Sequence, residues 1–439
     1  MGSMNDRDAV AWLHRRIGFG LRADELAAAV TRGPQAELQR LLQLATGPAP
    51  TDPWDDTQLP LDPKDKPSKP YAIGTWLESM IATTDPLRDR MAWFWHGHFV
   101  SALDKVRVAK FMVDQIRLFK TSGLGDFAAL LKKVTIDPAM LIYLDGGDST
   151  NKAPNENYGR EVMELFTLGV GNYTEDDVEA AARAWTGHNA DWPEYTYQFV
   201  PERHDGGQKT FFGTTKGWNG PDIIDEILRD NVDKRRIAAR YITKKLWDFF
   251  AYPGGPTNVI NELAEVFITG NFELRPLMRA LLLRDEFYTT AAVQGLVRTP
   301  TEWLVALGYH TGLSAEAIGA FWHGPRMGQA LFGPPNVAGW KHNAYWLSTA
   351  AVSARASAAR DVTWHLRQND GFDNLHAMSV SAAVDYVADY FAISPLSEAT
   401  RSALIAAHTA ERGAQSWPSY WAPTDLLTMA MLAPEMHMG

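Results

Sequence analysis

Apolar side chains recur at three- and four-residue spacing along most of the chain, which is the period of an amphipathic α-helix. Asp85-Pro86 is a cap followed by proline at the first helical position, a strong start for one such helix. The pattern predicts further helices over residues 35–44, 73–83, 106–119, 126–134, 156–168 and 175–185, and again from residue 222 to the C-terminus. The sequence therefore predicts a mainly α protein, a large multi-helix globular body.

One stretch has the residue types of strands instead. Residues 195–200 and 209–212 are rich in aromatic and β-branched side chains, with a polar turn between them, and they predict one small β-hairpin near residues 195–213. Residues 47–70 are rich in Pro and Asp and lack periodicity, which is typical of a loop or lid. We therefore divide the chain into an N-terminal helical segment (4–46), this loop or lid (47–70) and a main helical domain (71–439).

Composition narrows the class of protein and its partners. The net charge of −10 opposes attraction to phosphate backbones, so we expect no nucleic-acid partner. The chain has no cysteine, so any metal must be bound by His, Asp, Glu or Asn. No run of about 18 apolar residues occurs, so we expect no membrane span. Residues 1–4 resemble a vector remnant without an export leader after them, which predicts a cytoplasmic protein, or an exported one whose leader was trimmed.

The segment 93–99 holds two histidines, His96 and His98, in a His-x-His arrangement. On a helix these positions lie about 200° apart, so the two imidazoles could share a metal ion only if the helix broke between them. On the helix opened by Pro86, His98 shares the apolar stripe of Met91, and His96 points the other way. We therefore predict that His98 is the buried histidine. It is either a hydrogen-bonded core residue, or a metal ligand or proton carrier that faces a carboxylate.

A polar stripe begins at Asn155 and ends at Glu164. On a helix, Asn157, Glu161 and Glu164 fall at i, i+4 and i+7, beside the core face. Two carboxylates on one face repel each other, so we expect a raised pKa, recruitment of Arg160 or a bound cation. Glu161, Glu164 and Arg160 are therefore candidate catalytic residues, as is His98 if it faces them, and Asn155 and Asn157 are candidate substrate ligands. The alternative is a solvated helix face whose charges satisfy one another.

Two further segments carry candidate ligands. His204-Asp205 is similar to the metal-binding pair of phosphohydrolases, and Lys209 could supply positive charge for an anionic substrate. In a loop stiffened by two prolines, Asn336 offers a hydrogen-bond donor and acceptor, and Trp340 offers a flat stacking surface for a substrate. The alternatives are that His204 and Asp205 are ordinary turn residues, that Lys209 is an exposed strand lysine, and that the loop with Trp340 is a structural plug.

Several of these segments together resemble one large bacterial family, known as domain of unknown function eighteen hundred. The resemblance spans nearly the whole chain and rests on residues 13–20, 93–99, 137–145, 153–172, 204–210 and 334–340. Many relatives are exported and occur beside a sulfatase-like family, which implies envelope or polysaccharide chemistry, although this chain departs from them in lacking an export leader. The resemblance brings no established activity with it. It implies that His98, Glu161, Glu164, His204 and Asn336 converge.

From these observations we predict a metal-assisted enzyme, a hydrolase that acts on a polar or sugar-like substrate. Its divalent metal ion would be bound by His98, Glu161, His204 and Asp205, with Glu161 as base or ligand. The first alternative is a non-catalytic binding or scaffold protein in which the same groups form a buried hydrogen-bond network. The second is an oxidative metalloenzyme of a biosynthetic pathway. The expected partner is a small molecule or a saccharide.

Overall fold

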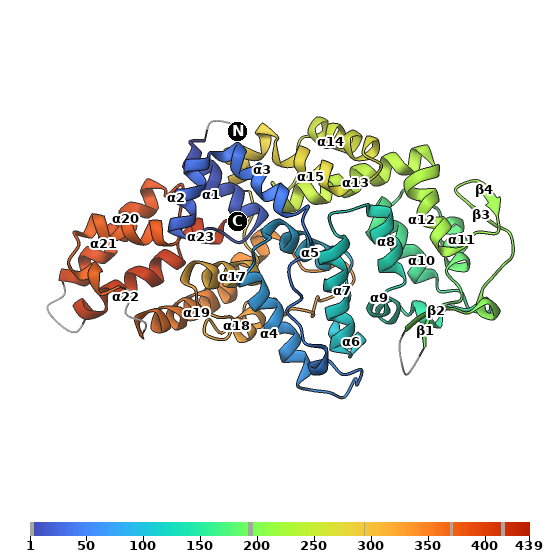
Figure 1. Cartoon of the computed structure of the whole chain (residues 1–439), viewed down its shortest axis with the longest axis horizontal. Coiled ribbons are helices and arrows are strands. Elements are labelled where there is room, and N and C mark those ends of the chain that lie inside the picture. The colour runs from blue at the N-terminus through green and yellow to red at the C-terminus, as the bar shows by residue number, and fades with distance from the viewer. Residues whose placement is uncertain (1–3, 192–195, 294, 369–371, 414–417) are drawn as a thin grey trace.

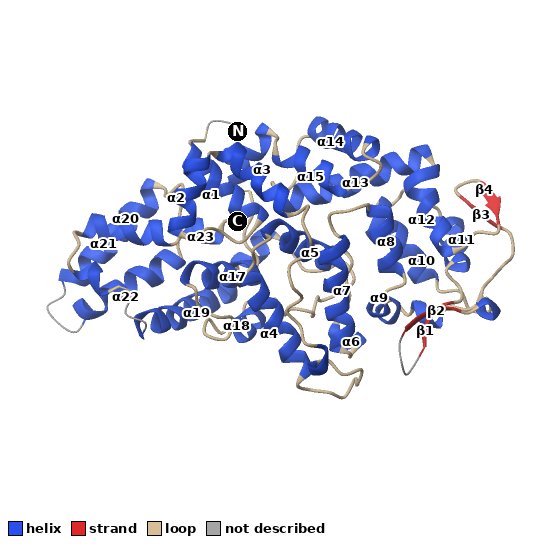
Figure 2. Ribbon diagram, in the orientation of Figure 1, coloured by secondary structure: helices blue, strands red, loops and turns tan. Residues whose placement is uncertain are grey.

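The computed structural model describes residues 4–191, 196–293, 295–368, 372–413 and 418–439. These residues form 23 α-helices and two antiparallel sheets of two strands each, which confirms the predicted mainly α fold (Figure 2). The helices of the N-terminal half are α1 (Asp6–Ile17), α2 (Ala23–Arg32), α3 (Pro34–Leu44), α4 (Ser68–Ile81), α5 (Pro86–His98), α6 (Leu103–Val106), α7 (Ala109–Ser122), α8 (Phe127–Thr135), α9 (Pro138–Tyr143), α10 (Glu156–Met163), α11 (Glu175–Ala184) and α12 (Gly220–Asp225).

The C-terminal half begins with the 19-residue helix α13. Its helices are α13 (Val232–Phe250), α14 (Thr257–Thr269), α15 (Leu274–Leu282), α16 (Thr290–Val293), α17 (Pro300–Thr311), α18 (Ala320–Arg326), α19 (Thr349–Gln368), α20 (Val380–Tyr390), α21 (Glu398–Gly413), α22 (Pro418–Met431) and α23 (Pro434–His437). The strands are β1 (His188–Asp191), β2 (Thr196–Phe199), β3 (Lys209–Phe211) and β4 (Thr214–Lys216). Short 3-10 or π-helical turns are η1 (Asp56–Gln58), η2 (Gly146–Asp148), η3 (Glu164–Leu168), η4 (Pro201–Arg203), η5 (Glu226–Asp230), η6 (Asp285–Tyr288), η7 (Asn343–Leu347) and η8 (Asp373–His376).

Local capping chemistry explains several helix starts. The Asp85 side chain accepts a hydrogen bond from a backbone N–H in the first turn of α5, and Pro86 occupies the first helical position. Thr174 and Thr299 form capping boxes at the starts of α11 and α17. The observed helices overlap the predicted ones, but the predicted helix 156–168 changes character, because α10 is followed directly by the π-helix η3.

The predicted hairpin between residues 195–200 and 209–212 is wrong in its pairing. Strand β2 pairs with β1, and β3 pairs with β4, so the region holds two separate hairpins. Phe212 and Gly213 have φ angles of 46° and 82°, which suit a tight two-residue turn between paired strands. That turn closes β3 onto β4 over a much shorter loop than a return to β2 would need. Tyr195, the first residue of the predicted hairpin, lies outside the described residues.

The molecule is elongated, with α20, α21 and α22 at one end and α10, α11, α12 and both sheets at the other (Figure 1). The C-terminal end lies near the middle of this view, close to α1, α17 and α23. One cluster of buried apolar side chains extends from Ala9 to Met436, so the segment 4–46 shares its core with the segment 71–439. Eleven of the thirteen residues of α5 are buried, which places this helix inside the body. Within the described ranges, none of the helices combines the length and apolar character needed to cross a lipid bilayer.

Candidate functional site

A cavity of about 510 Å³ lies between α5 and α13 in the middle of the molecule. It exceeds two other cavities, of about 380 and 320 Å³, and it has the size of a small-molecule site. Residues of the segments 296–302 and 340–343 also contribute to its wall. The lining side chains that carry a charge or an aromatic ring are Arg16, Arg90, Trp93, Phe94, His98, Tyr241, Lys244, Lys245, Asp248, Phe249, Glu302, Trp340, Lys341 and His342.

Two of the segments singled out by sequence meet at this cavity. Trp93 of α5 stacks on Trp340, with ring centroids 5.6 Å apart and 22° between the ring planes. Gly339 permits this approach, because a Cβ there would lie 2.7 Å from the Gly97 carbonyl oxygen, and its φ of +82° favours glycine. Trp340, which the sequence predicts as a stacking surface, therefore lines the cavity with one ring face packed against Trp93 of α5.

His98 is buried, as predicted, and it also lines the cavity. Its Nε2 lies 3.3 Å from the carbonyl oxygen of Phe166, and its Nδ1 is buried without a hydrogen-bond partner in the described residues. Burial, and then the charge of Lys245, hold the pKa of His98 well below its ordinary value. The imidazole is therefore neutral at pH 7 and keeps one ring nitrogen available. Among the described residues no hydrogen bond joins it to Glu161.

The prediction that His96 points away from the core is wrong. Its side chain has no exposed surface, and the rings of Trp76, Trp93, Phe332 and Trp340 surround it at centroid distances of 5.1 to 6.2 Å. The prediction assumed one buried face for α5, but neighbouring elements cover this helix on every side. Burial lowers the pKa of His96 to about 3, so it too is neutral.

The charged side chains of the cavity are biased toward positive charge. Two of the basic side chains form ion pairs. Arg90 Nη1 donates to Glu302 at 2.5 Å, and Lys244 pairs with Asp248, one turn further along α13. The five basic lining residues are Arg16, Arg90, Lys244, Lys245 and Lys341, and the two acidic ones are Asp248 and Glu302. The excess of three positive charges inside a low-dielectric wall raises the local concentration of anions.

A cluster of buried arginines surrounds Glu302, and two of them, Arg16 and Arg90, line the cavity. Arg16, Arg90, Arg298 and Arg355 are at most 3% exposed, and Glu302 is the buried carboxylate whose charge acts on all four. Burial lowers the pKa of Arg298 to about 9 and that of Arg355 to about 10. Although burial alone would raise it, the charges of Arg90 and Arg16 hold the pKa of Glu302 below its usual value. One carboxylate thus compensates several buried cations only in part.

Lys245 extends this positive region along α13. It is half-buried, its Nζ lies 5.1 Å from the centre of the Tyr241 ring, and it takes part in no ion pair within the described residues. Burial lowers its pKa, and the neighbouring Lys244 lowers it further, against the opposing effect of Asp248. A lysine in such surroundings is a frequent feature of functional sites.

The polar stripe from Asn155 to Glu164 does not line the cavity. Arg160 forms an ion pair with Glu175, and Glu164 accepts a hydrogen bond from the Tyr173 hydroxyl. Glu161 is 8% exposed, and burial together with the charge of Glu164 raises its pKa, as the sequence predicts for paired carboxylates.

The π-helix η3, which begins at the last residue of the stripe, contacts residues of the cavity wall through its main chain. Tyr241, which lines the cavity, donates its hydroxyl to the Leu165 carbonyl at 3.0 Å, and His98 contacts the next carbonyl, that of Phe166. The charges of Glu164 and Glu161 also contribute to a raised pKa of Tyr241, after burial, so these groups lie within electrostatic range of the cavity wall.

Asn155 occupies the N-cap of α10. Its Oδ1 accepts from the Tyr158 N–H at 3.1 Å, and its Nδ2 donates to the carbonyls of Leu144 and Asp145, each at 2.8 Å. Asn157, two residues on, is exposed. Replacing Asn155 by alanine is therefore expected to lower the free energy of unfolding by about 1–2 kcal/mol, from the lost cap and the unpaired carbonyls.

Urea denaturation measures this effect, with Asn157→Ala as the matched control. The control is expected to change the free energy of unfolding by less than about 0.5 kcal/mol, because its side chain is solvated. Equal stabilities of the two variants would show that the capping contacts contribute nothing to the fold.

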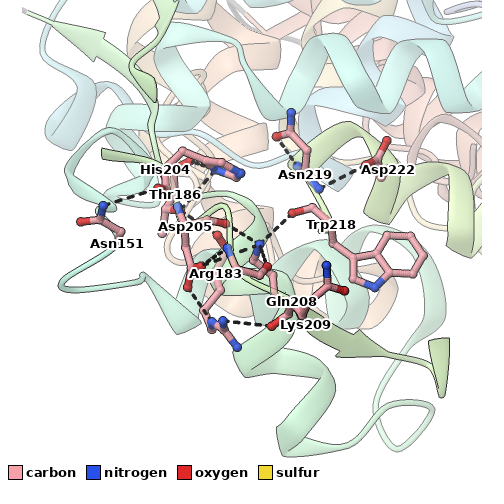
Figure 3. Close-up of polar contacts among 12 residues, drawn as sticks. Asn151, Arg183, Thr186, His204, Asp205, Gln208, Lys209, Trp218, Asn219 and Asp222 are labelled. Atoms are coloured by element: carbon pink, nitrogen blue, oxygen red, sulfur yellow. Dashed lines mark hydrogen bonds and ion pairs between the residues drawn. The ribbon is translucent and has the colours of Figure 1, made fainter. Parts of the chain in front are cut away.

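His204, Asp205 and Lys209 belong to a separate network (Figure 3). His204 Nδ1 lies 2.8 Å from the Thr186 carbonyl oxygen, and Asp205 accepts from Arg183 Nε at 2.7 Å. Lys209 is 2% exposed, and its Nζ donates to three carbonyl oxygens, those of Asp205, Gly207 and Trp218. The network holds the segment between β2 and β3 against α11, and none of these residues lines the cavity that contains His98.

Asn336 stabilises the turn that precedes Trp340. It accepts a hydrogen bond from the Ala338 N–H at 2.9 Å through Oδ1, and from the Gly339 N–H through its own carbonyl at 3.0 Å. Its side chain is exposed and does not line the cavity. Across the described ranges, no three His, Asp or Glu side chains lie close enough together to hold one metal ion.

Sequence reasoning missed the basic residues of the cavity. Arg16 stands in one of the segments that carry the family resemblance, but its position there did not indicate burial beside α5. Lys245 and Glu302 stand in helices with ordinary periodicity. The Lys244-Lys245 pair on a helix with many buried positions was the one local pattern that could have identified the basic wall.

Fold and site together define a mainly α protein with a cavity whose wall is aromatic and basic. The chain belongs to the family described as "Protein of unknown function (DUF1800)", whose model matches residues 12–438. The match includes the segments 13–20, 93–99 and 334–340, which supply Arg16, His98 and Trp340 to the cavity. Comparison with curated proteins gave no match, and comparison with solved structures gave none either.

Proposed function

We propose that the cavity between α5 and α13 binds a compact organic anion that carries a flat ring. The observation that carries this proposal is Lys245, a half-buried ammonium group in the cavity wall that forms no ion pair within the described residues. An anionic group of the ligand would be the carboxylate partner that Lys245 lacks. Charge-assisted hydrogen bonds of this kind are short and strong in a partly desolvated site.

The aromatic lining supports a ring on the same ligand. Trp93, Phe94, Tyr241, Phe249 and Trp340 all contribute to the wall. Aromatic side chains bind flat rings by offset stacking or edge contacts, beyond the gain from apolar burial. The arginines around Glu302 add positive potential, and Arg16 and Arg90 contribute it from the cavity wall itself.

Matched ligands test the proposal by calorimetric titration of the full chain. We expect 2-naphthoate to bind, and its neutral analogue 2-naphthamide to bind at least about ten-fold more weakly, because the amide removes the charge and keeps the ring. Lys245→Met is expected to remove this discrimination. Lys152→Met, at an exposed lysine outside the cavity, is the control and keeps it.

Equal affinity for the acid and the amide would contradict the anionic preference. Unchanged discrimination in Lys245→Met would contradict the assignment of Lys245, even if both ligands bind. Circular dichroism of each variant verifies that the helical content is unaltered.

The metal-assisted hydrolase of polar or sugar-like substrates stays a prediction for the neighbouring stripe. The raised pKa of Glu161, caused by burial and by Glu164, supports its role as a base. Stoichiometric metal in the purified protein that disappears in Glu161→Ala and in His98→Ala would favour it. Absence of metal, with only stability lost in both variants, would favour the non-catalytic alternative.

A further inference from the structure

Two exposed tryptophans flank a separate pocket of about 320 Å³ between α18 and α19. Trp322 of α18 is 68% exposed and Trp364 of α19 is 53% exposed. All other tryptophans whose side chains the structure describes are buried. Single exposed apolar residues are common, but two exposed tryptophans on the rim of one pocket form an aromatic surface that marks a candidate binding site.

Around the two rings, the pocket has both hydrogen-bond donors and hydrogen-bond acceptors. His323 Nε2 lies 2.9 Å from a carboxylate oxygen of Asp361, and Glu316, Arg326 and His365 complete the polar lining. The carboxylates accept hydrogen bonds, the guanidinium donates them, and the imidazoles do either. His323 itself is 4% exposed, and its Nδ1 has no hydrogen-bond partner within the described residues.

The pocket lies between two packed helices, α18 and α19. Gly319 precedes α18 with a φ of +61°, and a Cβ at this position would lie 2.9 Å from Cδ2 of His323. Glycine thus gives the chain its left-handed turn and leaves room for the imidazole. The hydrogen bond from His323 of α18 to Asp361 of α19 fixes the position of these two polar side chains between the helices that carry Trp322 and Trp364.

We propose that this pocket binds a neutral saccharide. A pyranose ring presents C–H groups on its faces, which pack on exposed tryptophan rings, and hydroxyl groups on its edge, which need both donors and acceptors. Trp322 and Trp364 supply the ring faces. Asp361 and Glu316 supply the hydrogen-bond acceptors, and Arg326 supplies the donors. Arg326 offsets one of the two carboxylates, Glu316 and Asp361, and so weakens the attraction of this aromatic site for a quaternary ammonium ligand.

The saccharide site is independent of the cavity between α5 and α13. The two share no lining residue, and one lies on the surface of α18 and α19 while the other lies against α5. Either site can therefore fail its test without any effect on the other.

The test uses the full chain and three soluble probes: cellopentaose, maltopentaose and penta-N-acetylchitopentaose. At least one is expected to bind in calorimetric titration, and Trp322→Ala and Trp364→Ala are each expected to weaken it by about ten-fold or more. Tyr345→Ala is the matched control, because Tyr345 is 57% exposed and precedes the other end of α19. Trp364 lies about 22 Å along that helix from its first residue.

A second measurement needs no variant. N-Bromosuccinimide oxidises accessible indoles, and peptide mass spectrometry locates the products. The bound saccharide is expected to protect Trp322 and Trp364 from oxidation. Failure of all three probes to bind, binding unchanged in both tryptophan variants, or binding of choline with no saccharide binding would each overturn the proposal.

Discussion

Glu302→Ala is expected to lower the free energy of unfolding by about 4 kcal/mol, because it removes the carboxylate from a cluster of buried arginines. Arg90 would lose its 2.5 Å ion pair, and Arg16, Arg298 and Arg355 would lose the opposite charge that partly offsets their burial. The backbone N–H of Thr299 would also lose its acceptor in the capping box. Guanidinium denaturation followed by circular dichroism measures the change.

One variant separates the contribution of the Glu302 charge from that of its hydrogen bond to Thr299, and a second variant is the control. Glu302→Gln keeps an oxygen for the Thr299 N–H and removes only the charge, so most of the loss is expected to remain. Glu262→Ala removes a 57% exposed carboxylate that pairs with Arg284, and its expected cost is below about 1 kcal/mol. A loss for Glu302→Ala as small as that of Glu262→Ala would mean that other groups compensate the arginines.

The protein is expected to lose stability as the pH falls from 7 to 5, because several histidines are buried in the neutral form. The pKa is lowered by burial to about 3 in His96 and His310 and to about 4 in His437. In the unfolded chain each histidine takes up a proton near pH 6.5, and in the folded protein it cannot. Each therefore contributes stability that is complete above pH 6.5 and falls by about 2 kcal/mol between pH 7 and pH 5.

One carboxyl group acts in the opposite direction. Burial raises the pKa of Asp137 to about 7, so this group is protonated in the folded protein before it is protonated in the unfolded chain. It adds about 2 kcal/mol of stability over the same interval, which offsets about one histidine. The net change across the three histidines and Asp137 is a loss of about 4 kcal/mol.

A single substitution isolates the effect of His96. Unfolding at pH 7 and pH 5 is expected to show that His96→Leu loses about 2 kcal/mol less than the unsubstituted protein over this interval. The control is His376→Leu, at an exposed histidine, which is expected to retain the full pH dependence. An identical pH dependence in His96→Leu would show that the buried imidazole becomes protonated without cost.

Local sequence determined most of the secondary structure. Helix periodicity and caps such as Asp85 and Thr174 predicted the helices, since these interactions involve residues within a few positions of one another. The burial of His98 followed from its place on one apolar stripe. The raised pKa of Glu161 followed from its spacing to Glu164, a contact set by the helix itself.

Only the tertiary structure decided the strand pairing, the burial of His96 and the charge of the cavity. Arg16, Arg90, Lys245 and Glu302 come from four helices that are distant in the sequence, and no local pattern indicates that they share one cavity. The reason is physical. A helix shows in its own periodicity that one face is apolar, but whether a charged group on another face meets water, a cation or a cavity depends on the helices that pack around it.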